Sequence, residues 1–165
     1  MKKYFIIILV FIGFHSFAQE RITLVTSAAE TFIETYNKSY SKEFTLDEAY
    51  RLGPSSTKTL KAGIRTALKW IDLNATSQKD FEKEICRFKA MEKEEYKFHG
   101  YVDEFAIEMT LNFKGNSDGT FILEIKPYNG YAKFISFSDK DMITNFRDLL
   151  DGKSPNKEID DIFKK

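Results

Sequence analysis

The sequence predicts a single two-layer α+β domain, with N-terminal helices, then an antiparallel β-meander of three to four strands, then C-terminal helices. Three observations predict this class. Apolar residues recur about every 3.6 positions through the first half and every second position within 105–137. The chain is 42% hydrophobic, which is enough to bury one core. No linker rich in Gly, Ser or Pro and no internal repeat divides residues 19–165.

Residues 1–18 have the pattern of a secretory signal peptide. Lys2 and Lys3 precede an apolar run, and the small residues Ser16 and Ala18 mark a cleavage site after Ala18. The run is shorter than the roughly 18–20 residues that span a bilayer. We expect an exported protein, periplasmic or extracellular, with no stable membrane insertion once the leader is removed. The alternative is an uncleaved leader that tethers the same domain to a membrane.

Four helices are expected before the meander. Ser27 and Glu30 have the spacing of a capping box, Thr45 repeats the cap signal, and Gly53 ends the second helix. The third helix has the clearest apolar stripe. The predicted ranges are 27–40, 45–52, 57–73 and 78–91, with Leu60, Ile64, Ala67, Leu68 and Ile71 in the stripe of the third and Phe81, Ile85 and Phe88 buried by the fourth.

Strict alternation of apolar and polar residues predicts three strands. The first covers 105–113, the second 121–125 and the third 131–137, and a further short strand is expected over 96–101. Turn residues at 115–119 separate the first two strands.

Charge and side-chain facing together predict the register of this meander. Like charges directly opposite one another destabilise a sheet, so we expect Glu108 opposite Lys126 and Leu111 opposite Leu123. A three-residue loop with Gly130 in a left-handed conformation would place Leu123 beside Ile135.

Two helices are expected after the meander. Ser138 or Asp139 caps the first, and Gly152 follows its end. Ser154 and Pro155 open the second. The apolar residues of the two helices are Met142, Ile143, Phe146, Leu149 and Leu150, then Ile159, Ile162 and Phe163.

Composition argues against several chemistries. The chain has 25 basic and 25 acidic residues, without the basic excess of a nucleic-acid binder, so no nucleic-acid partner is expected. Beyond residue 18, His99 is the single histidine and Cys86 the single cysteine. Zinc sites and histidine-based catalysis need more of these residues, so we expect no metal site and no cofactor. A Cys86–His99 dyad is the one thiol-based arrangement open to the chain, and Cys86 beside a helical core stripe is the favoured interpretation.

Two charged features are candidate binding residues. A basic stripe follows the long predicted helix, and two acidic residues share the polar face of the predicted sheet, where a carboxylate pair could act as acid and base. An ordinary solvated face is the favoured interpretation of each feature, and binding or catalysis is the alternative. The candidate residues are Lys58, Lys61, Arg65, Lys69, Glu108 and Glu124.

These observations favour a small exported protein without enzymatic activity, a binding module of the cell envelope that acts as an inhibitor, an immunity-type partner or an adaptor. Its partner would be a protein or an envelope polymer. The alternative is a small hydrolase or lyase that uses Glu108 and Glu124 from the open sheet face. The oligomeric state is not predicted.

Overall fold

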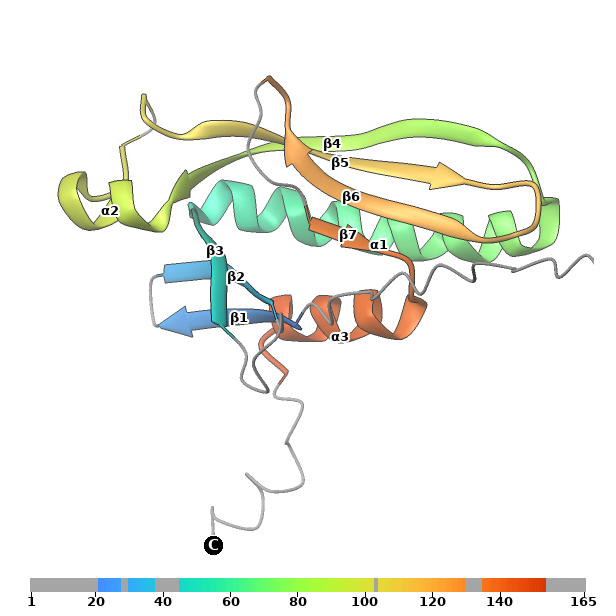
Figure 1. The fold of residues 1–165 in the computed structure, drawn as a ribbon, viewed down its shortest axis with the longest axis horizontal. Helices are drawn as coiled ribbons and strands as arrows, with labels where there is room; N and C mark the ends of the chain where they lie inside the picture. Colours follow the sequence, from blue (N-terminus) through green and yellow to red (C-terminus); the bar gives the residue numbers. More distant parts are fainter. Residues whose placement is uncertain (1–20, 28–29, 38–44, 103, 130–134, 154–165) are drawn as a thin grey trace, which may run out of the picture.

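The computed structural model describes residues 21–27, 30–37, 45–102, 104–129 and 135–153. Its strands form one seven-stranded antiparallel sheet in which the order in space follows the order in the chain (Figure 1). The strands are β1 (Arg21–Ser27), β2 (Glu30–Asn37), β3 (Thr45–Leu52), β4 (Phe81–Glu92), β5 (Ile107–Gly115), β6 (Phe121–Pro127) and β7 (Ile135–Phe137). The helices are α1 (Pro54–Ser77), α2 (Lys93–His99) and α3 (Lys140–Leu150).

The α+β class and the antiparallel sheet are confirmed, whereas the layout differs from the prediction. Three strands precede the first helix of the described chain, and the sheet is larger than a four-stranded meander. The predicted leader, Gly130 and the helix expected from Ser154 lie outside the described residues.

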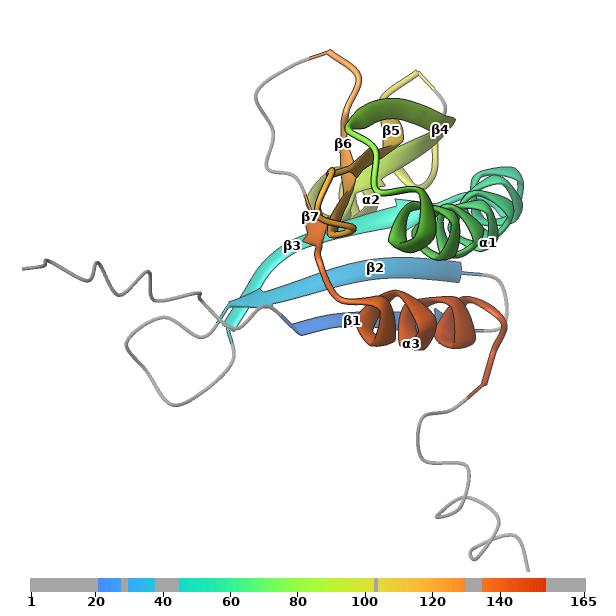
Figure 2. The ribbon, with the colours of Figure 1, turned by 90° about the vertical axis from the view of Figure 1, so that its right-hand side faces the viewer.

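The sheet curls around α1 and α3. Figure 2 shows β4–β6 turned away from β1–β3, with α1 lying beside both parts. Helix α3 packs against α1 and also reaches both edge strands, β1 and β7. The core lies between the helices and the concave face of the sheet, and its fully buried side chains include Leu60, Ile64, Met109, Leu111, Phe113, Leu123 and Ile125.

The long helix is confirmed and extends further than the apolar stripe predicted. Pro54 occupies its first turn, where a missing N–H costs nothing, and Gly53 precedes it in an extended conformation. The stripe residues Leu60, Ile64, Ala67 and Ile71 are buried, whereas the fifth, Leu68, is half-buried against the core. Helix α1 is therefore the central element of the core.

The two helices predicted over 27–40 and 45–52 are wrong, because the described residues of these segments form the end of β1, all of β2 and all of β3. Ser27 and Glu30 lie opposite one another at the end of the β1–β2 pair. A three-residue spacing fits a two-residue hairpin turn as well as it fits a capping box. The β-branched and aromatic residues of 31–36 favour a strand, and backbone pairing with β1 and β3 stabilises the strand over a helix.

The helix predicted over 78–91 and the strand predicted over 96–101 are also wrong. Most of the first segment belongs to β4, in which the register shifts between Glu84 and Cys86. This bulge adds one residue, so Phe81, Ile85 and Phe88 recur at helix-like intervals within a strand. The second segment mostly forms α2, which has Glu94 and Glu95 in its first turn and basic residues in its last, as the helix dipole favours.

The predicted register of β5 and β6 is wrong by two residues. Leu111 lies opposite Ile125 and Thr110 opposite Lys126, while Glu108 faces Lys89 across the other edge of β5. A shift of two keeps every side chain on its predicted face, so Met109, Leu111 and Phe113 are still buried. The β6–β7 prediction is wrong by the same amount, since Leu123 lies opposite Phe137.

The first C-terminal helix is confirmed. Oδ1 of Asp139 accepts hydrogen bonds from the backbone N–H groups of Asp141 (2.6 Å) and Met142 (3.3 Å). Ile143, Phe146 and Leu150 are buried, and Gly152 follows the helix with a φ of 75°.

Asn74 attaches the end of α1 to the β5–β6 hairpin. Its side chain is 1% exposed, and Nδ2 donates to the carbonyl oxygens of Asn116 (3.2 Å) and Thr120 (3.0 Å). The backbone N–H of Asn116 also donates to the Thr120 carbonyl at 2.9 Å, which closes the hairpin. The position of this loop, rather than charge pairing between the strands, therefore sets the β5–β6 register.

We predict that Asn74→Ala lowers the free energy of unfolding by about 1–3 kcal/mol, because the two partly buried hydrogen bonds that tie α1 to the hairpin are lost. Denaturant unfolding measures this, and Thr76→Ala, at an exposed position of the same helix, is the control and should change stability by less than about 0.5 kcal/mol. Equal stabilities of the two variants would contradict the role given to Asn74.

Candidate functional site

Strand β4 pairs with a neighbouring strand along one edge, whereas described strands pair with only a small part of its other edge. It pairs with β5 from Phe81 to Ala90, but with β3 only from Ala90 to Glu92. The β3 chain ends at Leu52, turns at Gly53 and enters α1, which then runs alongside the outer edge of β4 (Figure 1). The chain path itself therefore leaves a groove between α1 and β4.

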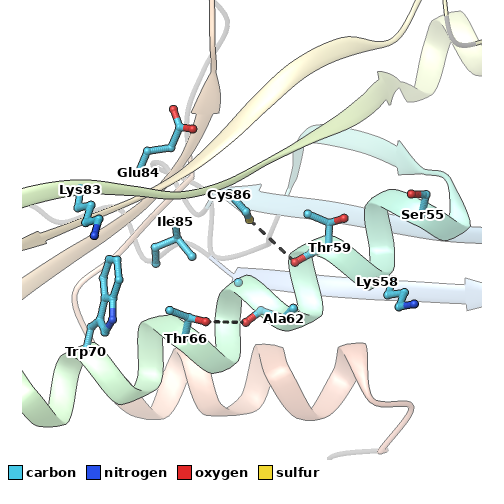
Figure 3. A pocket seen from close by; sticks show the side chains of 11 residues that line it. Ser55, Lys58, Thr59, Ala62, Thr66, Trp70, Lys83, Glu84, Ile85 and Cys86 are labelled. Carbon is cyan, nitrogen blue, oxygen red and sulfur yellow. Dashed lines mark hydrogen bonds between the residues drawn. The ribbon is translucent and has the colours of Figure 1, made fainter.

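This groove has a volume of about 660 Å³. In Figure 3, Lys83, Ile85 and Cys86 point from β4 toward the helix, whereas Glu84 points away. The lining residues are Ser55, Lys58, Thr59, Ala62, Gly63, Thr66 and Trp70 from α1, and Lys83, Glu84, Ile85 and Cys86 from β4.

Gly63 fixes how closely α1 approaches the sheet at the floor of the groove. A Cβ atom at this position would lie 2.7 Å from Sγ of Cys86 and 2.8 Å from Cδ2 of Leu111. Both distances are too short for real carbon contacts, so a side chain here would push the helix away from β4 and β5.

The groove carries an excess of positive charge. Lys58 and Lys83 extend from opposite ends of it, and within the described part of the chain neither forms an ion pair. Nζ of Lys83 lies 5.4 Å from the ring centre of Trp70. The single acid in the lining, Glu84, accepts a hydrogen bond from Arg87 at 2.8 Å.

Arg87 is itself held on the convex side of the sheet. Its guanidinium carbon lies 3.7 Å from the ring centre of Tyr128. The hydrogen bond to Glu84, and to a smaller extent contact with Tyr128, raise the pKa of Arg87. Arg87 thus stays charged and neutralises Glu84, which leaves the two lysines to set the charge of the groove.

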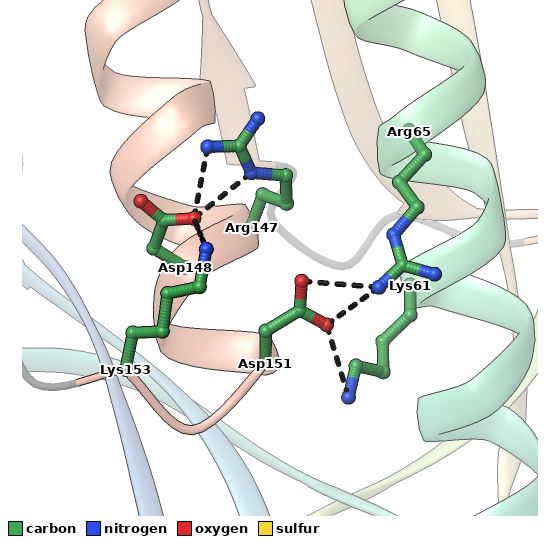
Figure 4. A network of polar contacts seen from close by, with 6 residues as sticks. All are labelled: Lys61, Arg65, Arg147, Asp148, Asp151 and Lys153. Atoms are coloured by element: carbon green, nitrogen blue, oxygen red, sulfur yellow. Dashed lines mark hydrogen bonds and ion pairs between the residues drawn. The ribbon is translucent and has the colours of Figure 1, made fainter.

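The basic stripe predicted on the long helix divides into separate parts. Lys58 lines the groove, whereas Lys61 and Arg65 contact Asp151 at the end of α3, at 3.2 Å and 2.9 Å (Figure 4). Lys69 is exposed and lies outside the groove. Lys61 and Arg65 therefore help to join α1 to α3.

Glu108 and Glu124 are far apart on the convex face. The backbone N–H of Tyr128 donates to the Glu108 carbonyl at 2.8 Å, so Glu108 lies opposite Tyr128, four residues along β6 from Glu124. At about 3.4 Å per residue, their Cα atoms are about 14 Å apart. Carboxyl pairs in glycoside hydrolases lie about 5–10 Å apart. Glu124 is also bonded to Lys126 at 3.2 Å, so the geometry does not favour an acid–base pair.

Cys86 and His99 each have other neighbours. The Cys86 thiol donates weakly to the Thr59 carbonyl at 3.9 Å, and the His99 ring lies 5.0 Å from that of Phe105 and 3.7 Å from a carboxylate oxygen of Glu95. Burial, and to a smaller extent the charge of Glu84, raise the pKa of the Cys86 thiol to about 11. These contacts fit a structural cysteine rather than a nucleophile.

Aromatic residues around α2 do not form one platform. The rings of Tyr96 and Tyr101 lie 5.6 Å and 5.9 Å from the guanidinium of the buried residue Arg51. Phe98 is 80% exposed, and Tyr128 belongs to the Arg87 contact.

Comparison with protein-family models, with curated proteins and with solved structures gave no match to this chain. Among the described residues, no group of three His, Cys, Asp or Glu side chains could hold a metal ion. None of the described helices is both long enough and apolar enough to cross a membrane.

The sequence indicated a candidate binding residue on the α1 side of the groove but none on the β4 side. Lys58 stands out as part of a basic stripe, but Lys83 and Ile85 fall in a segment predicted to be helical. Only the β-branched and aromatic residues of that segment could have indicated a strand, and the bulge hides their alternation.

We predict that the Cys86 thiol of the folded protein reacts with a thiol reagent at pH 8 about 100-fold more slowly than that of the unfolded chain. The raised pKa keeps the thiolate scarce until the pH is far above neutral. Labelling rates with and without denaturant measure the ratio, and similar rates in the two states would contradict the assignment of a structural thiol.

The pair of Asp151 with Lys61 and Arg65 should make stability depend on pH. Burial acts to raise the pKa of Asp151, but hydrogen bonds from Arg65 and Lys61 outweigh it and lower the pKa below its usual value. A lowered folded-state pKa stabilises the fold above the unfolded value of about 3.9, and this stabilisation is lost as the pH falls through the folded-state pKa.

We therefore expect Asp151→Asn to reduce the free energy of unfolding at pH 7 by a few tenths of a kcal/mol, the range of exposed ion pairs. Denaturant titrations of both proteins should give curves that converge as the pH falls through the folded-state pKa of Asp151, where its carboxyl becomes protonated. A difference in stability that does not shrink as the solution is acidified would show that the charge of Asp151 is not its cause.

Proposed function

We propose that this protein is a non-enzymatic binding module of the cell envelope that holds a macromolecular partner in the groove between α1 and β4. The observation that carries the proposal is the pair of groove lysines, Lys58 and Lys83, beside the apolar surface of Trp70 and Ile85. An inhibitor, an immunity-type partner and an adaptor would all use such a surface. The signal-peptide pattern of residues 1–18 is the support for the envelope location.

The chemistry of the groove supports binding for two reasons. Its volume of about 660 Å³ lies in the range of about 300–1,000 Å³ that is usual for ligand sites. Its apolar residues can supply contact area, while two lysines without ion pairs in the described chain can orient an anionic partner. The groove is bounded by a helix and a strand rather than by loops, so its shape is largely formed before binding.

We predict that the double variant Lys58→Glu, Lys83→Glu loses at least about 90% of the partner that the immobilised full chain captures from native envelope extract. Reversing both charges replaces attraction by repulsion at the two ends of the groove. Quantitative mass spectrometry of the retained material measures the loss, and circular dichroism checks that the variant is folded.

The matched control is Lys69→Glu, which makes the same charge change on an exposed position of α1 outside the groove. It should retain the partner as the unchanged protein does. Equal loss from both variants would assign binding to general charge attraction, and no loss from the double variant would move the binding surface away from the groove.

A further inference from the structure

We propose that the groove binds an extended, acidic segment of a partner protein, which adds to the outer edge of β4 as a further strand of the sheet. This inference rests on the proposed function, because it names the chemistry and the binding mode of the partner in the same groove. It is carried by the direction of the β4 backbone groups, by the length of the open β4 edge and by the charge of the groove.

The hydrogen bonds show which backbone groups of β4 face the groove side. The Lys89 N–H donates to Oγ of Ser56 at 3.1 Å, and therefore points away from β5. Glu108, the β5 residue opposite Lys89, accepts a hydrogen bond from the Tyr128 N–H through its backbone carbonyl. The carbonyl of Glu108 therefore points toward β6 and away from β4. In an antiparallel pair, such outward residues alternate with those that bond the neighbouring strand.

Alternation extends this assignment along β4. Arg87 lies opposite Thr110, Glu84 opposite Asn112 and Glu82 opposite Lys114, and these β5 residues belong to the same alternating set as Glu108. The bulge absorbs the extra residue between Glu84 and Arg87. The backbone N–H and C=O groups of all three β4 residues thus point to the outer edge.

No hydrogen bond within the described chain uses the outward backbone groups of Glu82, Glu84 or Arg87. From Glu82 to Lys89 the edge is about 23 Å long at about 3.3 Å per residue. Proteins often protect such an edge with charges and a bulge, and β4 has both, which discourages pairing with arbitrary strands. An added strand with complementary charge overcomes that protection.

The side chains around the edge specify that complement. Lys58 and Lys83 stand at the two ends of the groove, and Arg87 already neutralises its one acid, Glu84. Ala62 and Ile85 lie between the lysines, and Trp70 lies beside Lys83 at one end of the groove. A strand that alternates carboxylates with apolar side chains would satisfy both sets, since alternate side chains of a strand point to opposite sides.

The charge of the groove also favours one occupant over another. A second copy of β4 would bring a second Lys83 into an already basic groove, and the α1 helix that packs along its edge would have to enter with it. A single extended segment carries no such helix. We therefore assign the groove to a partner segment rather than to another copy of this chain.

A library of random ten-residue peptides, selected on the full chain, tests the proposal. We expect enrichment of peptides that alternate Asp or Glu with β-branched residues. N-methylation of alternate backbone amides in a selected peptide should weaken its binding by at least about tenfold, since it removes edge hydrogen bonds and keeps every side chain. Hydrogen exchange should slow at the amides of Glu82, Glu84 and Arg87 when the peptide binds.

A second test changes the protein. Glu84→Pro removes one outward N–H, as edge strands tolerate, and should weaken peptide binding several-fold more than Glu84→Ala, which removes only the side chain. The methylated peptide tests the same bonds on unchanged protein, so the result does not depend on how well the proline variant folds.

Several outcomes would overturn the proposal. These are selected peptides without acidic residues, binding that N-methylation leaves unchanged, and recovery of sequences from this chain itself, which would make a copy of the chain the occupant. If envelope capture still depends on Lys58 and Lys83 in those cases, the groove remains the binding surface and only strand addition fails. If capture ignores both lysines, the proposed function fails first.

Discussion

The packing of α1 against the concave face of the sheet is the constraint on which the rest of the structure depends. Leu60, Ile64, Ala67 and Ile71 of its apolar stripe are buried in the concave face, and Leu68 packs at the margin of the core. Gly63 permits close contact with β4 and β5, and Asn74 ties the helix end to the next hairpin. Because this one helix touches five of the seven strands, its position decides the curvature of the sheet and the width of the groove.

The same helix explains why the open edge of β4 exists. A longer β3 would continue to pair with β4. Gly53 and Pro54 instead turn the chain into α1 after only three residues of β3 have paired with β4. The helix then covers the floor beneath β4 without bonding its outer backbone groups, except where Ser56 accepts from Lys89. The groove is thus a direct product of the connection between a strand and a helix.

Sequence reasoning succeeded where a single period ran without interruption. The stripe of α1, the alternation from Met109 to Phe113 and the Asp139 cap are strong local signals, and tertiary structure agrees with each. It failed where two structures share one spacing, as at Ser27 and Glu30, or where a bulge breaks alternation, as at Ile85. Register failed because the loop around Asn116, held by Asn74, outweighs pairing between charges.

In the candidate site, Lys58 could be predicted from the sequence, but the residues that face it across the groove could not. Lys61 and Arg65 share its stripe, yet contact with Asp151 gives them a structural task that only the position of α3 reveals. Lys83 and Trp70 come together because a helix and a strand, 13 residues apart in the chain at these positions, run side by side. Local patterns carry no information about such pairing, which depends on the path of the whole chain.

Contact of α3 with both β1 and β7 also bears on the order in which the molecule can assemble. The first and last described strands are separated by most of the chain, and α3 lies against both. Contacts so distant in sequence form slowly. A chain that emerges from a ribosome therefore cannot close this core until residues 140–150 have been synthesised, so most of the polypeptide must wait for its last described helix before it can fold.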